Sequence, residues 1–545
     1  MEKRQMQWRI VGVFVVMLTI ASGLMVRLYA LSMNVDLEQA AQSQSAYTLQ
    51  ITTTRGQIYD RNLQPLTDTE QRNYLAVLPT DDAVQACAEQ ITGTSRRLAL
   101  DAAAQGTPFV LPLEDGQKVY AADVENFTVS SRLPHDPSEQ LAVHLLGYLD
   151  GEGNGVSGIE QAYNDRLAAA GEQVTVRCQV DALGRPMENG TMQVEGSSRP
   201  PQQGVILTLD KRMQQVVEQV GEQIDQGAIV VMDVQTGAIT ASASFPQYDP
   251  YHLEAALEDV GQPLINRALL PYCVGSSFKL SVAAAALEEG ISSSFLVDCV
   301  GGTTVAGRIF YCHNRAGHRE TDLKRAIEQS CNPYFIKLGQ ETGAEQLLGM
   351  AKALGFGQET QLADGVIAQA GNLPTLGELS SPHELANFSF GQGKLTATPV
   401  QIAAMVSAVA NGGMAVTQHL VMGTTEDGQT VQEKESPAPV RVFSQQTAAF
   451  LQEAMIGVVE EGSAPLAQPK QGGAGGKTAS AQTGLYDEEG EEIVHAWFAG
   501  FFPAQNPQYA AVILIEGGEY GGQVASPLFA QLVDLYGPLD EAEIQ

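Results

Sequence analysis

The most pronounced hydrophobic feature of the chain is one long apolar segment near its N-terminus. Residues 10–26 (IVGVFVVMLTIASGLMV) carry no charge, and the apolar run continues past Arg27 into LYAL. Its length approaches the span of a bilayer, and Arg27 lies close enough to the end to extend toward the headgroups. The pattern therefore predicts a transmembrane helix over residues 10–31. A cleaved signal peptide is the alternative, because small residues (ASG) occur within the run.

Basic residues precede this segment, at Lys3, Arg4 and Arg9. Positive charge before an apolar helix favours a cytoplasmic N-terminus, here residues 1–9. The chain is therefore predicted to cross the cell membrane once. Everything from about Ser32 onward is expected to be extracytoplasmic.

Two regions that differ in their pattern of apolar and polar residues follow the apolar segment. Residues 32–204 contain strand-like pieces separated by turns rich in Gly, Pro and Asp, with no evident nucleophile, base or metal cluster. We interpret this region as a structural or partner-binding module, an extracytoplasmic pedestal with a dimerisation-like role. From Val205, VILTLDKRMQQVVEQVGEQI predicts a short strand and an amphipathic helix, and GAIVVMDVQTGAITASAS predicts two strands around a Gln-Thr-Gly turn.

Residues 205–545 alternate strand and helix patterns in a definite order. Ala-rich helical stretches follow the first strands, and HAWFAGFFP and YAAVILIEGG predict two more strands near the end. The arrangement predicts one α+β domain, with an antiparallel sheet that joins its first and last segments. Within it, Thr398 and Gln401 form a predicted capping box for a helix that Gly412 ends.

Composition and charge narrow the class of protein. The 545 residues are too many for one ordinary core, so two or three domains are expected. With 44% hydrophobic and 17% charged residues, the chain is globular. Its net charge of −32 repels nucleic acid, so no nucleic-acid partner is expected.

The six cysteines give no clear framework. They are too few for a disulfide scaffold in so long a chain, and their spacing matches no zinc pattern. Cys299 and Cys312 flank a stretch, DCVGGTTVAGRIFYC, that could form a hairpin. The two cysteines could form a disulfide with each other, or both could be free thiols, and the sequence leaves both alternatives open.

The first candidate for chemistry is CVGSSFKLSVAAAALEEG, residues 273–290. Gly275 breaks the chain before an Ala-rich helix, so Ser276 is expected at or next to the helix N-terminus, with Lys279 one turn later on the same face. A buried lysine can accept the proton of a serine nucleophile, and the helix N-terminus offers N–H groups to an oxyanion. The alternative is that Ser276 only caps the helix and Lys279 is a solvated charge.

The second candidate is the stretch SCNPYF after a predicted helix. Pro333 disfavours helical geometry at Asn332, so Ser330 and Asn332 are expected on a tight interhelical turn with their side chains free to project. There they could relay a proton and hold a substrate amide. In the alternative, both side chains only cap backbone groups.

The third candidate is GKTASAQTG, residues 476–484. A phosphate-binding P-loop would need a glycine five residues before Gly476, where Gln471 stands, and no apolar strand precedes it. The stretch is instead predicted to be the first strand of a hairpin, because YDEEGEEI and HAWFAGFF follow it.

Together the three candidates, S-x-x-K, S-x-N and K-T-x, resemble the active-site motifs of class B penicillin-binding proteins. RGQIYDRN, HLLGY, GVSGIEQAY, TLDKRMQQ, FGQGKLTATPVQ and AWFAGFFPA also resemble segments of that family, over nearly the whole chain. The resemblance implies a membrane helix, an irregular mixed pedestal domain, and a penicillin-binding or serine β-lactamase-like transpeptidase domain. That domain has an antiparallel sheet and an all-helical subdomain. The pedestal argues against a simple β-lactamase.

The resemblance implies a role for each side chain in cross-linking peptidoglycan. Ser276 would attack the penultimate D-alanine of a D-Ala-D-Ala stem peptide to form an acyl-enzyme, and Lys279 would be the base. Ser330, supported by Lys477, would pass the proton to the leaving amine, and Asn332 would hold the substrate amide.

The remaining implied roles concern the substrate carboxylate and the oxyanion. Thr478 and Ser480 would bind the carboxylate, and the N–H groups of Ser276 and Ser480 would form the oxyanion hole. An amine of a second stem peptide would then take the acyl group. Neither a metal nor another cofactor is implied. Where the family has K-T-G, this chain has Ala479, whose methyl group would leave a non-catalytic scaffold if it blocked the site.

The implied ligands and partners are peptidoglycan stem peptides, β-lactam antibiotics, a membrane glycan polymerase, and a division or elongation complex. Two other functions compete with the transpeptidase. In a D,D-carboxypeptidase or a β-lactamase-like hydrolase, water resolves the acyl-enzyme. A β-lactam sensor would be expected to have several membrane helices and a cytoplasmic output, whereas only one apolar segment and about nine preceding residues are present here.

Overall fold

The computed structural model describes two compact units. The described residues are 2–33, 46–68, 70–114, 116–131, 140–181, 183–187, 191–196, 200–250, 252–487 and 489–537. The first unit comprises Met1–Thr54, Glu70–Ser131 and Gly171–Pro200, and the second comprises Arg55–Thr69, Arg132–Ala170 and Pro201–Gln545. The second unit thus includes three segments of the region predicted as a pedestal, residues 55–69, 132–170 and 201–204.

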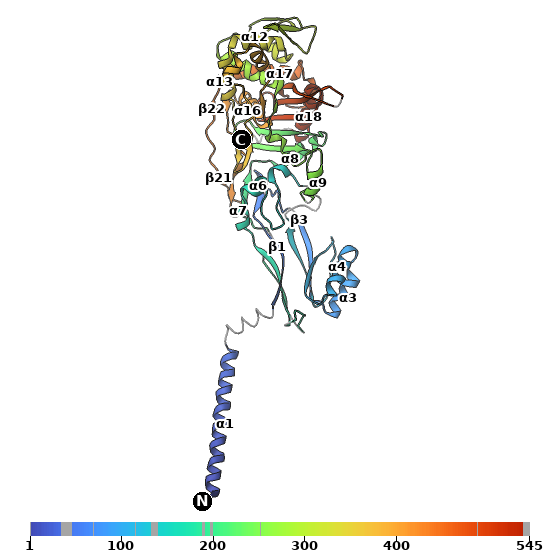
Figure 1. Ribbon diagram of the computed structural model, residues 1–545, viewed down its shortest axis with the longest axis vertical. Helices are drawn as coiled ribbons and strands as arrows, with labels where there is room; N and C mark the ends of the chain where they lie inside the picture. Colours follow the sequence, from blue (N-terminus) through green and yellow to red (C-terminus); the bar gives the residue numbers. More distant parts are fainter. Residues whose placement is uncertain are drawn as a thin grey trace. The chain divides into compact units, whose positions relative to one another are not determined.

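The N-terminal apolar run forms helix α1, Glu2–Ser32 (Figure 1). Its side chains from Arg4 onward are exposed to the surroundings. Among the described helices it is the one long and apolar enough to cross a membrane. The predicted helix over residues 10–31 is confirmed as a helix.

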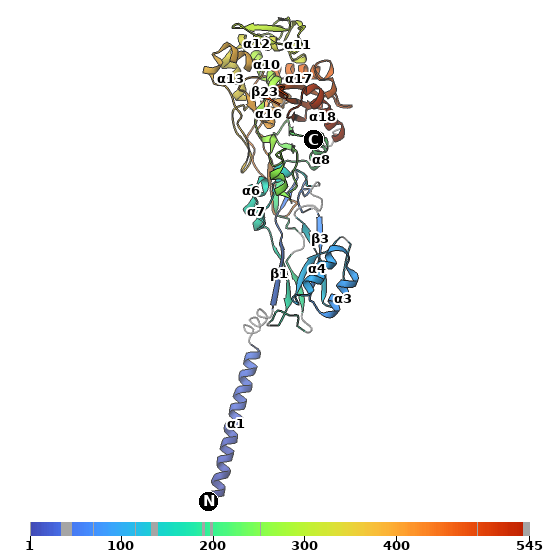
Figure 2. The same cartoon turned by 45° about the vertical axis from the view of Figure 1, so that its right-hand side comes forward.

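The first unit also contains two three-stranded antiparallel sheets. The first has the order β1-β6-β7, and the second has the order β4-β3-β5 with α3 and α4 beside it (Figure 2). Leu75 and Val77 of the second sheet share a buried core with Ala83 of α3 and Ala99 of α4. The bounds are β1 Ala46–Thr53, β6 Gln173–Gln179, β7 Met192–Glu195, β3 Glu70–Val77, β4 Phe109–Pro112, β5 Val124–Ser131, α3 Asp81–Gln90 and α4 Gly93–Ala103.

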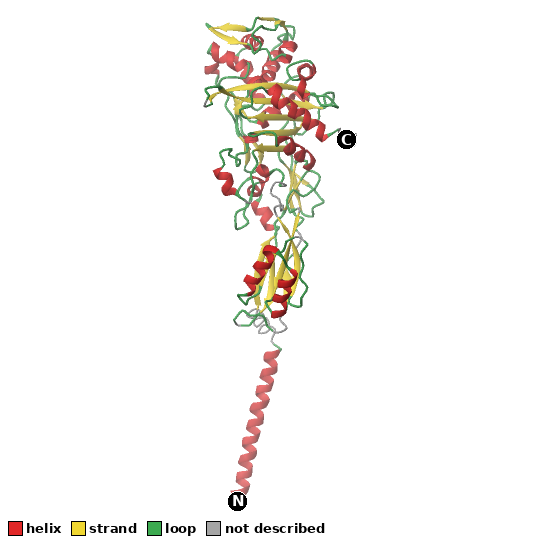
Figure 3. Ribbon diagram, turned by 90° about the vertical axis from the view of Figure 1, so that its right-hand side faces the viewer, coloured by secondary structure: helices red, strands yellow, loops and turns green. Residues whose placement is uncertain are grey.

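A five-stranded antiparallel sheet forms the centre of the second unit (Figure 3). Its order is β10-β9-β25-β24-β23, with bounds β9 Gly227–Asp233, β10 Ile239–Phe245, β23 Gly475–Tyr486, β24 Glu492–Phe502 and β25 Tyr509–Ile515. Strands β9, β10 and β25 are buried along nearly their whole length because helices cover both faces of the sheet. The sheet joins the first and last segments of residues 205–545, as predicted.

Helices lie on the two faces of this sheet. Helices α8 (Lys211–Gly221) and α18 (Gly521–Tyr536) contact each other as well as β10 and β24, whereas α16 (Pro399–Ala410) packs on β9 and β25. The predicted capping box of α16 is present, because the Thr398 and Gln401 side chains each accept a hydrogen bond from the other's backbone N–H. The helix ends at Ala410, two residues before the predicted Gly412.

The helical subdomain is built mainly from five helices and a short 3₁₀ turn. Their bounds are η3 Gly275–Phe278, α10 Lys279–Glu288, α11 Leu323–Glu328, α12 Asn332–Thr342, α13 Ala344–Ala353 and α17 Gln445–Glu460. Two short ladders adjoin it: β12 (Val297–Cys299) pairs with β15 (Arg319–Thr321), and β13 (Gly302–Val305) pairs with β14 (Arg308–Tyr311). The predicted hairpin between Cys299 and Cys312 is therefore confirmed, and both are free thiols.

The remaining elements are short. They are β2 Gln57–Tyr59, α5 Val143–Leu146, α6 Gly158–Ala162, α7 Asn164–Ala169, β8 Gly204–Leu207, α9 Leu253–Glu258, η2 Arg267–Leu269, β11 Tyr272–Cys273, β16 Thr360–Ala363, β17 Val366–Ala368, α14 Leu376–Leu379, α15 Pro382–Ser389, β18 Thr396–Ala397, β19 Met414–Ala415, β20 Val421–Thr425, β21 Gln432–Glu433, β22 Val440–Arg441 and η4 Pro465–Ala467. Strand β8 followed by α8 confirms the strand and amphipathic helix predicted after Val205.

Two of the segments quoted for the family resemblance bind each other. Arg55 of RGQIYDRN is buried, and its Nε lies 2.8 Å from a carboxylate oxygen of Glu160 in GVSGIEQAY. The same guanidinium donates to the Asn164 side-chain oxygen at 2.9 Å. The additional hydrogen bond offsets part of the desolvation cost of the buried ion pair, which joins the two segments.

Candidate active site

Ser276 lies in a 3₁₀ turn that runs directly into α10. Gly275 precedes it with a φ of 62°, a conformation that favours glycine, and its N–H donates to the Gly391 carbonyl at 2.9 Å. Ser276 is partly exposed, whereas Ser277 and Lys279 on either side of Phe278 are buried. The α-helix begins at Lys279, so Ser276 lies one turn before it, near the start of the combined helix.

Lys279 joins the first motif to the second. Its side chain is fully buried, and Nζ donates to the Ser330 carbonyl at 2.8 Å, to Ser330 Oγ at 3.1 Å and to Asn332 Oδ1 at 2.6 Å. Burial lowers the pKa of Lys279 to about 8. The alternative of a solvated lysine is therefore wrong.

Ser330 lies at the centre of the hydrogen-bond network. Its hydroxyl accepts from Lys279 and also from Lys477 Nζ at 2.9 Å, so two lysines converge on one oxygen. Its φ of 50° is in the left-handed region, which costs a non-glycine residue about 1–2 kcal/mol. The surrounding contacts hold the residue there despite that cost.

Asn332 differs from its predicted position. It is the first residue of α12, with Cys331 as the N-cap, whereas an interhelical turn was expected to include it. The missing N–H of Pro333 costs nothing in the first turn of a helix, so the helix can begin directly before the proline. The Asn332 side chain nonetheless projects to Lys279 and donates to the Tyr311 carbonyl at 3.2 Å.

The third motif is the first strand of the β23–β24 hairpin, as predicted. Lys477 is fully buried, and it donates to the Thr478 carbonyl as well as to Ser330. Burial, and then the charge of Lys279, hold the pKa of Lys477 well below its ordinary value. Thr478 Oγ1 lies 3.3 Å from Ser463 Oγ, and Ser480 Oγ accepts from the Gly521 N–H at 3.4 Å.

Ala479 and Ala481 point toward the turn that carries Ser276. A Cβ atom added to Gly275 would lie 3.3 Å from the Ala479 Cβ and 3.1 Å from the Ala481 Cβ. The methyl group that replaces the glycine of K-T-G is therefore accommodated against Gly275. This contact places strand β23 next to the turn that carries Ser276. Thr478 and Ser480, which are on the same strand, therefore lie near that turn as well.

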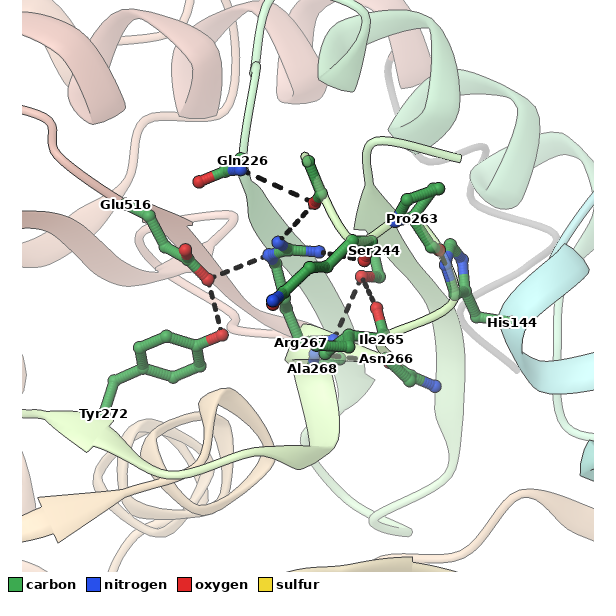
Figure 4. Close-up of polar contacts among 12 residues, drawn as sticks. His144, Gln226, Ser244, Pro263, Ile265, Asn266, Arg267, Ala268, Tyr272 and Glu516 are labelled. Carbon is green, nitrogen blue, oxygen red and sulfur yellow. Dashed lines mark hydrogen bonds and ion pairs between the residues drawn. The ribbon is translucent and has the colours of Figure 1, made fainter. Parts of the chain in front are cut away.

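A second polar network fixes the strand that leads to Ser276 (Figure 4). The Arg267 Nε lies 2.8 Å from a Glu516 carboxylate oxygen, and the Tyr272 hydroxyl donates to the same oxygen at 2.6 Å. The Trp497 indole N–H donates to the Cys273 carbonyl at 3.1 Å. The sequence analysis did not identify these residues. The one feature that could have indicated them is the acidic residue Glu516 directly after the apolar strand YAAVILI.

The three motifs thus meet in space: Lys279 of α10 and Lys477 of β23 both contact Ser330, which lies between α11 and α12, and both lysines are buried. The family profile of the penicillin binding protein transpeptidase domain matches residues 227–534, which include every one of these motif residues. This chain belongs to that family. It is a class B penicillin-binding protein.

Two curated relatives show how far the similarity extends. Stage V sporulation protein D of Bacillus subtilis is 30% identical over 446 residues, which are 77% of this chain and 66% of the relative. The probable peptidoglycan D,D-transpeptidase PenA of Neisseria gonorrhoeae is 26% identical over 536 residues, 91% of this chain and 86% of the relative. The chain spans just under two thirds of the length of several of its curated relatives, the Bacillus protein included.

Solved structures share the fold. Penicillin-binding protein 2 of Helicobacter pylori has a TM-score of 0.66 at 24% identity, and the match covers 90% of this chain and 99% of that protein. The same Helicobacter protein in complex with MreC has a TM-score of 0.63 at 22% identity, with 90% and 98% covered. These likenesses establish the predicted architecture of the class B penicillin-binding protein.

Proposed function

We propose that this class B penicillin-binding protein is a peptidoglycan D,D-transpeptidase that works through an acyl-enzyme on Ser276. The observation that carries the proposal is the convergence of Lys279 and Lys477 on the Ser330 hydroxyl, with Lys279 one turn after the partly exposed Ser276. A hydroxyl between two buried lysines is suited to proton transfer. A hydrogen-bond network with a purely structural role would not require two fully buried lysines.

In the acylation step, neutral Lys279 takes the proton of the Ser276 hydroxyl as Oγ attacks the carbonyl carbon of the penultimate D-alanine. An ester bond forms, and the peptide C–N bond breaks. The leaving amine of the terminal D-alanine receives a proton from Ser330, which Lys477 and Lys279 can resupply. A lysine pKa of about 8 leaves roughly a tenth of Lys279 neutral at pH 7, enough for a base.

In the second step, the amine of a neighbouring stem peptide attacks the ester carbonyl. A new amide bond forms, the ester bond to Ser276 breaks, and the amine proton returns through the same lysines to the Ser276 oxygen. The N–H groups of Ser276 and Ser480 stabilise the oxyanion in both steps. Asn332 accepts from Lys279 and presents its amide to the substrate, and Thr478 and Ser480 bind the substrate carboxylate.

We also propose the cellular setting. Helix α1 anchors the protein in the cell membrane as a single pass, with residues 1–9 cytoplasmic, the pedestal at residues 32–204, and the transpeptidase domain outside. β-Lactams, which mimic D-Ala-D-Ala, acylate the same serine. A membrane glycan polymerase and a division or elongation complex stay predicted partners, in line with the Helicobacter complex with MreC.

The test uses the full chain in detergent with a synthetic stem pentapeptide and an amine acceptor. Mass spectrometry should detect cross-linked product with release of terminal D-alanine in equal amount, and Ser276→Ala should form neither. Release of D-alanine without cross-linked product would identify a carboxypeptidase. Product formation by Ser276→Ala would contradict the assignment of the nucleophile.

A further inference from the structure

Four buried side chains gather beside the S-x-N turn and have no role in the transpeptidase mechanism. They are Cys299, Cys312, His318 and Cys331. Their sulfur atoms and one imidazole nitrogen all lie within 4.8 Å of one another, and none of the three thiols is in a disulfide. Each of the four is at most 7% exposed.

We propose that these residues bind one zinc ion in a closed, four-coordinate structural site. The His318 Nδ1 lies 3.8 Å from Cys299 Sγ and 3.5 Å from Cys312 Sγ. In a tetrahedral zinc site, Zn–S bonds of about 2.3 Å and Zn–N bonds of about 2.0 Å place sulfur and nitrogen about 3.5 Å apart. The observed separations already have this size.

The ligand set favours zinc over other metals. Three thiolates and an imidazole match the Cys₃His class of structural zinc sites, whereas magnesium and calcium take oxygen ligands. All four coordination positions are filled by the protein, which leaves none for a water or a substrate. The ion would therefore have a structural role.

The backbone around the cluster brings the ligands together. Gly301 and Gly317, with φ values of 92° and 81°, allow close approach: a Cβ on Gly317 would lie 2.0 Å from the Cys299 carbonyl oxygen, and one on Gly301 would lie 2.0 Å from that of Arg315. The Cys312 N–H donates to the Gly301 carbonyl at 3.0 Å. The turn is thus already folded around the cluster.

The ligands come from separate segments, and this explains why their spacing matched no zinc pattern. Cys299 ends β12, Cys312 follows β14, His318 precedes β15, and Cys331 is the N-cap of α12. Because β12 pairs with β15, the Cys299 backbone lies opposite Arg319, next to His318. Pairing of strands distant in sequence completes the set.

Cys331 connects the proposed ion to the active site. It lies between Ser330 and Asn332, so a metal bond would fix the turn that holds Ser330 in its left-handed conformation. Asn332 also donates to the carbonyl of Tyr311, the residue before Cys312. Cys331 is therefore a positioning residue, and the ion would keep Ser330 and Asn332 in place for Lys279.

The first test measures metal in the full-length protein, purified in detergent without chelators. Elemental analysis should find one zinc per chain. Cys299→Ser and His318→Ala should lose the metal, while the matched controls Cys273→Ser and Cys178→Ser, cysteines outside the cluster, should retain it. Wild type that contains no zinc after incubation with the ion would overturn the proposal.

A second measurement uses wild type alone, so it does not depend on whether the variants fold. Cobalt(II) exchanged for the native metal should give the absorption of thiolate-to-cobalt charge transfer and of a tetrahedral site. Removal of the metal should lower the midpoint of thermal unfolding and slow penicillin acylation by about tenfold or more, with recovery on adding zinc but not magnesium.

Two results would count against the site. A Cys299–Cys312 disulfide, found by peptide mapping of the non-reduced protein, would replace the ion and overturn the proposal. Cobalt that gives no thiolate charge-transfer band would do the same. Metal content and spectra are independent of catalysis, so the zinc site can fail or hold whatever the outcome for the transpeptidase.

Discussion

Two fully buried lysine side chains donate hydrogen bonds to one serine hydroxyl. The proposed proton transfer depends on this contact. Lys279 and Lys477 come from motifs almost 200 residues apart, and Ser330 lies between them. Burial lowers the pKa of both lysines, and the charge of Lys279 lowers the pKa of Lys477 further. A neutral amine is therefore accessible near neutral pH, as a general base requires.

We predict that Lys279→Ala acylates with penicillin at least about a hundredfold more slowly, because the base that accepts the Ser276 proton is gone. The measurement is the second-order rate of labelling by a fluorescent penicillin, with circular dichroism as the check on folding. Lys352→Ala, at an exposed lysine of α13, is the control and should label at the wild-type rate. An unchanged rate for Lys279→Ala would assign the base elsewhere.

Ala479 gives a second prediction for a single residue. Its methyl group faces Gly275 and removes no hydrogen-bond donor, so Ala479→Gly should change the acylation rate by less than about tenfold, roughly 1.4 kcal/mol. Ser480→Pro deletes the proposed oxyanion N–H and should nearly abolish acylation. If wild type were inactive and Ala479→Gly restored labelling, the scaffold alternative would be correct.

At the scale of elements, the Arg267, Glu516 and Tyr272 network holds β11 against the end of β25. Arg267 is almost fully buried, and Glu516 is its charged partner. We predict that Glu516→Ala lowers the free energy of unfolding by about 3 kcal/mol, because a buried guanidinium loses its counter-charge.

Urea unfolding monitored by fluorescence is the measurement for this prediction. Glu453→Ala is the matched control, because the Lys324–Glu453 pair is largely exposed and should contribute less than about 1 kcal/mol. Equal effects of the two substitutions would mean that the network does not support β11.

The sequence predicted several elements of the second unit, including the five strands of its central sheet, because their signals are local. The Gln-Thr-Gly turn, the capping box of α16 and the β23–β24 hairpin each follow from neighbouring residues. The start of α12 at Asn332 was not predicted, because the helix begins one residue before its proline. Nothing local indicates that Arg267 meets Glu516, since that contact depends on the register of β25 beside β9.

The same limit applies to the candidate site. The identities of Ser276, Lys279, Ser330 and Lys477 followed from the motifs, but the left-handed backbone of Ser330 did not. The four residues of the proposed zinc site were not recognised as a group either, because strand pairing and the α12 N-cap bring them together. In both cases tertiary contacts decide the outcome.

The buried side chain of His144 makes the stability of the whole molecule depend on pH. Burial lowers its pKa to about 4, the hydrogen bond to the Pro263 carbonyl opposes the decrease, and the charge of Arg267 adds to it. The Tyr248 ring packs edge-on against the imidazole. The unfolded chain binds a proton near pH 6.5 and the folded one does not, so stability falls as the pH drops from 6.5 toward 4.

We predict that His144→Gln removes part of this pH dependence. Between pH 7.5 and pH 5, wild type should lose up to about 2 kcal/mol more of its unfolding free energy than the variant. The control is His252→Gln, at an exposed histidine, which should follow wild type. Parallel pH curves for His144→Gln and wild type would show that this histidine is not buried in its neutral form.

Labelling with a fluorescent penicillin tests whether Ser276 is the nucleophile of the transpeptidase domain. Full-length protein should be labelled with one penicillin per chain, and peptide mapping should place the label on Ser276. Ser276→Ala should not be labelled. Ser277→Ala, at a neighbouring serine whose buried hydroxyl has no hydrogen-bond partner among the described residues, should be labelled like wild type. Stoichiometric labelling of Ser276→Ala, or a label on another residue, would show that Ser276 is not the nucleophile.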